Sequence, residues 1–443
     1  MCFGLSCNTR EEPDPFDTYI SEAMKLWDYR GAVLVAKHDS ILHRGGYGYA
    51  NAASESESTT ETKFLIGSLT KSFTAIAVMQ LLQEGTISLD DRLTEYLTDY
   101  PAEVGDSVTI RHLLSHTSGI KDVILVEEFR RRMLEPIAPE DIVSMFENLQ
   151  LDFRPGEKYS YSSSNYVLLG LIIESVTNQS WETYIRDHIC RPLNMTNTGV
   201  FDDYADRNDF ATGYGTDSAG TIVEAMTIYP GNGYAAGSLA STVDDLYKLN
   251  LALFDTVLLR REYIDLMLTR QSASFGYGWI VDNFGGHKLT AHGGGTPGFV
   301  SMLQRWVDDS LCVIVLSNCS TSPVHTIANG LAAIALGERY ELPQVKQPGE
   351  VDTQNLSDYE GTYSLSSGED RAITKRGIQL LARRSTGPEY RLLPESEDRF
   401  YFAHDHMTTI EFVRDSSGTV IAHVLWQGFD ADTAMKVLGR PAD

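Results

Sequence analysis

The stretch Phe64–Phe73, FLIGSLTKSF, decides how the rest of this sequence is interpreted. It joins a glycine-containing loop to a strongly apolar segment, Leu69–Glu84, which is predicted to be a helix. Ser68 and Lys71 stand at that junction, and positions i and i+3 share one face of a helix, about 4.5 Å apart along its axis. The amine of Lys71 is therefore expected to reach the hydroxyl of Ser68.

Two interpretations of this pair are open from these residues alone. In the first, burial and the positive end of the helix dipole lower the pKa of Lys71 and make it a base for a nucleophilic Ser68. In the second, Ser68 caps the helix and Lys71 is a solvated residue of the first turn. An S-x-x-K pattern is expected by chance about once in a chain of this size. Other segments of the sequence are therefore needed to choose between the two interpretations.

A second candidate is Tyr161-Ser162-Ser163, which directly precedes an apolar helix predicted at Tyr166–Glu174. Polar side chains at a loop-to-helix junction can point into a cleft, and a tyrosine beside an ammonium ionises more easily. The alternative is an ordinary cluster of hydroxyl caps, with Ser163 or Ser164 capping the helix.

A third candidate is His292–Gly295, HGGG, which is predicted to lie between two strands. Three glycines let a backbone approach a substrate closely and aim N–H groups at it, as one side of an oxyanion hole requires. A plain hairpin loop is the alternative. Gly293–Gly298 also spells G-x-G-x-x-G, but Pro297 and the strand-like sequence after it exclude a dinucleotide-binding turn. No G-x-S-x-G elbow occurs in the chain.

Charge and cysteine content exclude several classes of function. The 443 residues include 36 Lys+Arg and 61 Asp+Glu, a net charge of −25, which repels nucleic acid and anionic membrane surfaces. The five cysteines form no C-x-x-C pair, so neither a zinc site nor a disulfide framework is predicted. No metal or other cofactor is expected. Without a recognisable secretory signal or an apolar run of about 20 residues, the chain is predicted to be cytoplasmic and not membrane-bound.

The order of the predicted elements indicates an α/β (α+β) architecture in two domains. Strands flank a mostly helical middle that runs from about Asp90 to Phe254, so a sheet built from both ends of one domain is expected, with an all-helical insertion. A polar stretch that contains proline, Leu342–Thr353, is predicted to be a linker. Beyond it, short alternating segments predict a small antiparallel barrel or sandwich. The predicted domains are residues 1–345 and 346–443.

Taken in order, S-x-x-K, Y-S-x and H-G-G resemble the serine β-lactamase-like and penicillin-binding-protein family, in particular its class C-related esterases and D-aminopeptidases. The likeness covers roughly Phe16 to Leu336. Connecting phrases also match: IRHLLSHTSGI at Ile110–Ile120, FRPGEKYSYSSSNYVLLG at Phe153–Gly170 and AAGSLASTVDDL at Ala235–Leu246. The resemblance implies an antiparallel sheet flanked by helices with an all-helical subdomain. The C-terminal segment resembles the lipocalin-like barrel often appended to this branch.

The resemblance also implies roles for single residues. Ser68 is expected to be the nucleophile that forms an acyl-enzyme, and Lys71 and Tyr161 the pair that accepts its proton and later activates water or another acceptor. The backbone N–H groups of Ser68 and Gly295 are expected to form the oxyanion hole. The residues expected to bind substrate or oxyanion are Ser163, Asn165, His292, Gly293, Gly294 and Gly295.

Two residues depart from the family pattern. Ser163 stands where the family usually carries Asn, and its shorter hydroxyl cannot span the same hydrogen bonds; Asn165 follows two residues later. His292 stands where β-lactamases and DD-peptidases carry Lys, and a neutral imidazole is a poorer partner for a substrate carboxylate. The departure at His292 disfavours penicillin hydrolysis and D-Ala-D-Ala carboxypeptidase activity, and that at Ser163 disfavours the usual contact with the substrate amide or with Lys71. His116, in LSHTSG, is interpreted as structural.

The sequence thus predicts a serine hydrolase that cleaves a small ester, amide or peptide-like substrate, as an esterase or a D-amino-acid amidase or aminopeptidase. Two alternatives stay open: an acyltransferase of natural-product metabolism, and a non-catalytic member of the fold that serves assembly or ligand binding. The net charge and His292 together favour neutral or amine-bearing substrates. The barrel is expected either to cover the cleft or to mediate a homodimer.

Overall fold

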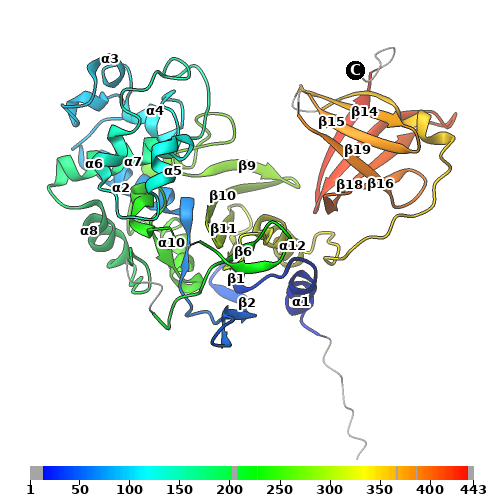
Figure 1. Cartoon of the computed structure of the whole chain (residues 1–443), viewed down its shortest axis with the longest axis horizontal. Coiled ribbons are helices and arrows are strands. Elements are labelled where there is room, and N and C mark those ends of the chain that lie inside the picture. The colour runs from blue at the N-terminus through cyan, green and yellow to red at the C-terminus, as the bar shows by residue number, and fades with distance from the viewer. Residues whose placement is uncertain (1–12, 202–206, 227, 366–367, 386, 438–443) are drawn as a thin grey trace, which may run out of the picture. The chain divides into compact units, whose positions relative to one another are not determined.

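The computed structural model describes residues 13–201, 207–226, 228–365, 368–385 and 387–437. The chain divides into two compact units. The larger, Trp27–Ala335, carries all the candidate catalytic residues, and the smaller consists of Met1–Leu26 with Leu336–Asp443. The smaller unit contains the helix α1 (Pro15–Trp27) and the C-terminal barrel, whose strands are orange and red in Figure 1.

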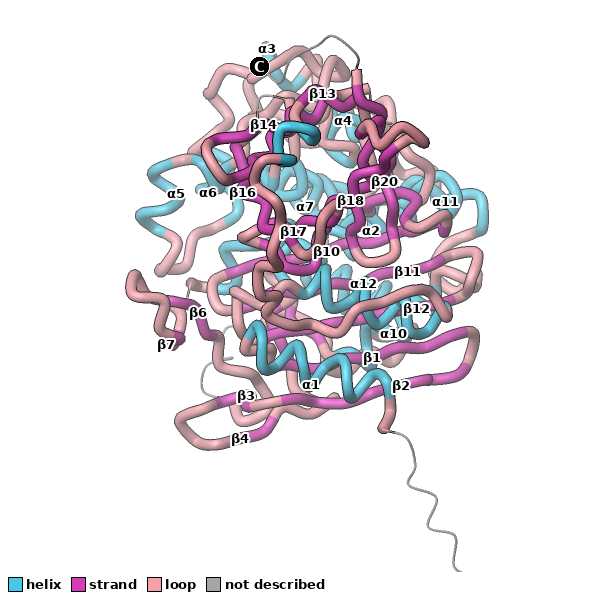
Figure 2. Tube along the Cα trace, turned by 90° about the vertical axis from the view of Figure 1, so that its right-hand side faces the viewer, coloured by secondary structure: helices cyan, strands magenta, loops and turns pink. Residues whose placement is uncertain are grey.

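The larger unit is built on a six-stranded antiparallel sheet with the order β2-β1-β12-β11-β10-β9. Five of these strands, β2, β1, β12, β11 and β10, follow one another from the bottom of Figure 2 upward. The strands are β1 (Gly31–Lys37), β2 (Ser40–Tyr47), β9 (Ile280–Phe284), β10 (His287–Thr296), β11 (Phe299–Trp306) and β12 (Leu311–Ser317). Because β1 and β2 come from one end of the unit and the other four from the opposite end, the predicted sheet is confirmed.

Helices cover both faces of this sheet. Gln304 and Arg305 are consecutive on β11, so their side chains point to opposite faces. Gln304 Nε2 donates to Asn329 Oδ1 on α12 (Val324–Leu336) at 2.7 Å, and Arg305 Nε donates to Asn250 Oδ1 on α10 (Val243–Ala252) at 2.9 Å. These two contacts place α12 on one face and α10 on the other.

The segment between β2 and β9 is mainly helical, as predicted. Its remaining helices are α2 (Thr70–Glu84), α3 (Ala102–Gly105), α4 (Ile110–Leu114), α5 (Glu127–Arg132), α6 (Pro139–Ser144), α7 (Ser163–Thr177), α8 (Trp181–Ile185), α9 (Tyr234–Gly237) and α11 (Arg261–Met267). It also holds the two-stranded pairs β3 (Tyr49–Asn51) with β4 (Ser56–Glu57), β5 (Phe64–Leu65) with β8 (Ala240–Ser241), and β6 (Tyr214–Thr216) with β7 (Ile222–Glu224). Among the described residues, no helix combines the length and apolar character that a bilayer span requires.

The glycines of HGGG lie inside strand β10 and not in a loop between strands, which corrects the sequence-based expectation. The ladder between β10 and β11 continues through Gly295↔Val300 to Thr296↔Phe299. The glycines are required because the turn η1 (Gly67–Leu69) packs directly on this strand. A Cβ atom on Gly294 would lie 1.9 Å from the carbonyl oxygen of Ile66, and one on Gly67 would lie 2.8 Å from the nitrogen of Gly295.

The smaller unit contains a closed antiparallel barrel of eight strands, which confirms the predicted C-terminal barrel. Its strands are β13 (Gly361–Ser364), β14 (Asp370–Arg376), β15 (Gln379–Arg384), β16 (Glu389–Pro394), β17 (Arg399–Phe402), β18 (Asp405–Arg414), β19 (Val420–Gln427) and β20 (Asp430–Lys436). The pair Tyr363↔Lys436 closes the barrel. Ile373, Phe400 and Ile410 belong to one buried apolar cluster inside it, as is usual when eight strands leave room only for side chains.

We predict that Gly294→Ala lowers the free energy of unfolding by more than about 2 kcal/mol, because the new methyl group overlaps a backbone carbonyl that cannot move alone. The matched control is Gly295→Ala, where the nearest atom to an added Cβ is 4.0 Å away. Chemical denaturation followed by tryptophan fluorescence measures both variants. Equal stability losses in the two variants would contradict the proposed close contact.

Candidate active site

Ser68 and Lys71 are in direct contact at the start of α2. Lys71 Nζ donates hydrogen bonds to Ser68 Oγ at 3.1 Å and to the carbonyl oxygen of Ala236 at 2.8 Å. Lys71 is fully buried because α2 is covered on all sides from Thr70 to Leu81. None of the described carboxylates forms an ion pair with its amine. The interpretation of Lys71 as a solvated residue of the first turn is therefore wrong.

Burial determines the protonation of this amine. Loss of water lowers the pKa of Lys71 to about 7, although the negative charge of Asp122 acts in the opposite direction. Ser68 is half-buried and does not cap the helix: the N-cap of α2 is Leu69, without a side-chain cap hydrogen bond. The serine hydroxyl is thus available for the contact with Lys71.

The carbonyl that holds Lys71 is itself fixed by α2. It belongs to the short helix α9, in which the neighbouring carbonyl of Ala235 accepts a hydrogen bond from Thr74 Oγ1 at 2.7 Å. At the start of α9, Tyr234 has φ +39°, a strained value for a residue with a side chain. Its hydroxyl donates to Glu174 Oε1 on α7 at 2.6 Å. Contacts with α2 and α7 therefore maintain the turn that receives the amine.

Tyr161 completes a group of three around the Ser68 hydroxyl. Lys71 Nζ lies 4.9 Å from the centre of its ring, and the Ser68 side chain is near enough to lower the pKa of the Tyr161 phenol. Burial raises the pKa of Tyr161 above its ordinary value of 10, and the Ser68 side chain only partly opposes this effect. The easier ionisation predicted for a tyrosine beside an ammonium is therefore outweighed by burial. At neutral pH Tyr161 is a phenol.

His116 supports Tyr161 from the side. The centres of their rings are 4.3 Å apart, and His116 Nδ1 accepts the backbone N–H of Ser162 at 3.2 Å. This bond places the imidazole proton on Nε2. Burial, and then the charge of Lys71, lower the pKa of His116 well below 6.5, so the ring is neutral. The sequence identified His116 as structural, and the structure gives it a place against a candidate catalytic side chain.

Asp122 is a residue of the site that the sequence did not single out. Its Oδ1 accepts the backbone N–H groups of Ser163 at 3.1 Å and Ile124 at 3.2 Å. Burial raises the pKa of Asp122, while these two bonds and Lys71 lower it. In the sequence, the only sign of this residue is an aspartate directly after HTSGIK. Its proximity to Lys71 arises only in the folded chain.

The glycine strand and Ser68 form one corner of the site. The backbone of Gly67, the residue before Ser68, lies directly against that of Gly295. The predicted oxyanion hole requires this proximity, because its N–H groups are those of Ser68 and Gly295. His292 is buried, and its Nδ1 donates to the carbonyl oxygen of Gly293 at 2.6 Å. Burial, and then Lys71, lower the pKa of His292 to about 3, so this side chain carries no charge at pH 7.

A cavity of about 420 Å³ opens beside Ser68. Ser163 and Gly295 are among the residues that line it, whereas Lys71, Tyr161 and His292 are not. Asn165 does not line the cavity: its Oδ1 accepts a hydrogen bond from Ser118 Oγ at 2.6 Å, and its Nδ2 lies 3.4 Å from Nδ1 of His116. The structure thus places Ser68, Ser163 and Gly295 in the wall of one cavity. Lys71, Tyr161, Asn165 and His292 lie outside this wall, although Lys71 contacts Ser68 directly.

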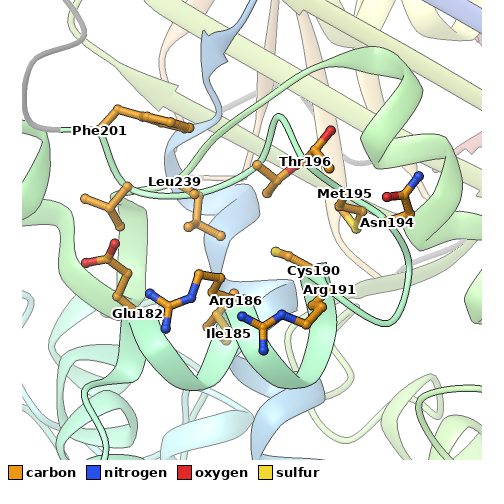
Figure 3. Close-up of a pocket in the computed structure, with 13 residues that line it drawn as sticks. Glu182, Ile185, Arg186, Cys190, Arg191, Asn194, Met195, Thr196, Phe201 and Leu239 are labelled. Atoms are coloured by element: carbon orange, nitrogen blue, oxygen red, sulfur yellow. The ribbon is translucent and has the colours of Figure 1, made fainter.

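A second cavity, of about 440 Å³, lies beside α8 and the π-helical turn that follows it (Figure 3). Its wall includes Arg186 and Arg191, both of which form ion pairs with Asp187, at 2.9 and 3.2 Å. None of the predicted catalytic or binding residues lines it. The cavity beside Ser68 is therefore the candidate active site.

An antiparallel sheet with helices on both faces, and a buried helix that begins with S-x-x-K beside a glycine strand, define the β-lactamase fold class. The family profile described as Beta-lactamase matches residues 16–337. The chain belongs to this family, which confirms the resemblance found in its motifs.

Known relatives of the chain are penicillin-binding proteins and amidases. Penicillin-binding protein 4* of Bacillus subtilis (strain 168) is 29% identical over 398 residues, which cover 84% of this chain and 88% of the relative. The octameric penicillin-binding protein homologue from Pyrococcus abyssi has 29% identity and a TM-score of 0.69, and the match covers 95% and 99% of the two chains. The D-amino acid amidase from Ochrobactrum anthropi SV3, complexed with D-phenylalanine, has 25% identity and a TM-score of 0.58. This match covers 69% of the present chain and 92% of the amidase.

We predict that Asp122→Asn shifts the reactivity of Ser68 to lower pH. The carboxylate of Asp122 raises the pKa of Lys71, so its removal lowers that pKa and moves the acid limb of the pH profile down, by up to about one pH unit. The amide oxygen can still accept the two backbone N–H groups. The rate of covalent labelling of Ser68 by a fluorophosphonate, measured between pH 5 and 9, reports the shift.

The control for this variant is Asp152→Asn, which removes an exposed carboxylate paired with Lys121 at 3.8 Å. Its pH profile is expected to match that of the unmodified protein. A shift of the Asp122→Asn profile to higher pH would contradict the assigned electrostatic role.

Proposed function

We propose that the protein is a serine hydrolase that forms an acyl-enzyme on Ser68 and cleaves an ester or an amide. The observation that carries this proposal is the buried amine of Lys71, 3.1 Å from Ser68 Oγ and without a carboxylate partner among the described residues. With a pKa of about 7, roughly half of this amine is unprotonated at neutral pH. It can then accept the proton that Ser68 must lose.

The protonation states assign the first step. Ser68 Oγ attacks the substrate carbonyl carbon while its proton moves to Lys71 Nζ, because Tyr161 is already protonated and cannot accept it. The N–H groups of Ser68 and Gly295 stabilise the oxyanion. The Tyr161 phenol then donates a proton to the departing alkoxide or amine and regains one from Lys71. This leaves the acyl group on Ser68 and the amine of Lys71 neutral again.

The second step releases the acyl group. A water molecule attacks the ester carbonyl, its proton passes to Lys71, and Ser68 Oγ recovers a proton as the acid departs. The same groups can activate an alcohol or amine in place of water, which is the acyltransferase alternative. Product analysis with an added alcohol distinguishes the two acceptors.

The comparisons support the reaction class. One similar structure is named a D-amino acid amidase, and the relative in Bacillus subtilis is named a penicillin-binding protein. The neutral His292 offers no fixed cation to a substrate carboxylate. For this chain we therefore rank ester and amide cleavage above hydrolysis of penicillins or of peptides that end in D-Ala-D-Ala.

We predict that Ser68→Ala lowers kcat/KM at least about a thousandfold on every substrate that the protein hydrolyses, because the nucleophile is removed. The panel contains p-nitrophenyl esters, D- and L-amino acid amides and a chromogenic cephalosporin. In parallel, mass spectrometry is expected to find the fluorophosphonate adduct on the peptide that contains Ser68. The matched control is Ser54→Ala, at an exposed position outside the site.

Full activity of Ser68→Ala, or an adduct on another residue, would overturn the nucleophile assignment. A protein that hydrolyses nothing on the panel and takes up no label would support the non-catalytic alternative.

A further inference from the structure

The wall of the cavity beside Ser68 is apolar over most of its area. It comes from five parts of the chain: β5 with η1, the segment around η3 (Val123–Leu125) and α5, the start of α7, the residues from Ile228 into α9, and the end of β10 with Pro297. The apolar side chains in this wall are Leu65, Val123, Ile124, Phe129, Met133, Val167, Ile228, Pro230, Ala236 and Pro297. An apolar wall with a few polar groups at one end is typical of a ligand site.

The position of the proton donor shows which half of a substrate this cavity holds. In the proposed reaction, Tyr161 gives a proton to the leaving group, and neither Tyr161 nor Lys71 lines the cavity. Ser68 and Gly295 do line it. A substrate with its carbonyl oxygen at the N–H groups of Ser68 and Gly295 therefore directs its leaving group toward Tyr161 and its acyl part into the cavity.

The charges around the cavity select the kind of acyl group. Among its described lining residues only Arg130 is ionisable, and this exposed side chain donates from Nε to the carbonyl oxygen of Ile124 at 2.7 Å. The wall contains no carboxylate: Asp122 is outside the lining, where its Oδ1 holds two backbone N–H groups. The ammonium of an amino acyl group would lose water here without gaining an anionic partner.

The size of the cavity sets the length of the acyl group. At roughly 30 Å³ for each water-sized group, 420 Å³ holds on the order of ten non-hydrogen atoms. Ser163 lines the cavity, and its small side chain takes up little of this volume.

We propose that this cavity is the acyl pocket of an esterase that accepts neutral, apolar acyl groups of medium length, in preference to D-amino acyl groups. The inference rests on the proposed function of Ser68. It selects the esterase from the two activities that the motifs left open. It assigns specificity to Val123, Phe129, Val167 and Ile228, which belong to none of the three motifs.

The test uses the full chain with p-nitrophenyl acetate, butyrate and octanoate and with D-phenylalanine p-nitroanilide. Burial of each added methylene stabilises the bound acyl group, so kcat/KM is expected to rise at least tenfold from acetate to octanoate. The anilide is expected to be the poorest substrate. In Val167→Phe the added ring fills the cavity, and the ratio of octanoate to acetate activity is expected to fall at least tenfold.

A second variant, Ile228→Phe, narrows the same cavity from a half-buried position and covers the case in which Val167→Phe does not fold. The matched control, Val257→Phe, changes an exposed valine far from any lining residue in the sequence and is expected to keep the ratio.

Two results separate this inference from the proposed function. If a small fluorophosphonate labels Ser68 while the ester series is flat, or while the D-phenylalanine derivative is preferred, the acyl pocket is overturned and the serine hydrolase stands. If Ser68 takes no label and no ester is hydrolysed, the acyl-pocket inference and the proposed serine hydrolase function are both overturned. If the ratio of octanoate to acetate activity falls as much in Val257→Phe as in Val167→Phe, the assignment of the cavity as the acyl pocket is also contradicted.

Discussion

The site depends on one contact in which two backbones meet without a side chain between them. The strand β10 lies against the turn that carries Ser68, so close that a methyl group on Gly294 would overlap the carbonyl oxygen of Ile66. This contact fixes Ser68 relative to the central sheet, and the sheet in turn is covered by α10 and α12. Glycine is required at Gly67 and Gly294 for reasons of space, and the same approach brings Gly295 next to the turn that carries Ser68.

The electrostatics of the site follow from burial more than from charge pairing. Two histidines near Lys71, His116 and His292, are both held neutral, and Asp122 supplies a negative charge that opposes the effect of burial on the amine. A lysine at position 292 would add a positive charge beside Lys71 and lower its pKa further. With His292, the basicity of Lys71 is controlled by burial and by Asp122.

The sequence predicted what is local and missed what is tertiary. The contact of Ser68 with Lys71 follows from helical spacing, and strand patterns at both ends of the domain predicted the sheet. The Ala236 carbonyl has no residue signature, since any residue can supply a backbone oxygen. Asp122 and the protonation of Tyr161 depend on burial, which no local pattern specifies. In the barrel, β14 (DRAITKR) and β20 (DADTAMK) contain four and three charged residues out of seven, so a hydrophobic pattern gives little signal for either strand.

The burial of Lys71 also lowers the stability of the folded domain. The pKa of this lysine is about 7 in the folded chain and near 10.5 when exposed, so the unfolded chain binds more protons between those values. The resulting loss of stability is absent above about pH 10.5, grows as the pH falls, and is complete below about pH 7. At the pH where the amine is useful, it therefore weakens the domain. The free energy of unfolding is therefore expected to rise with pH through the range in which Lys71 loses its proton, whereas a neutral side chain at this position would add no such dependence.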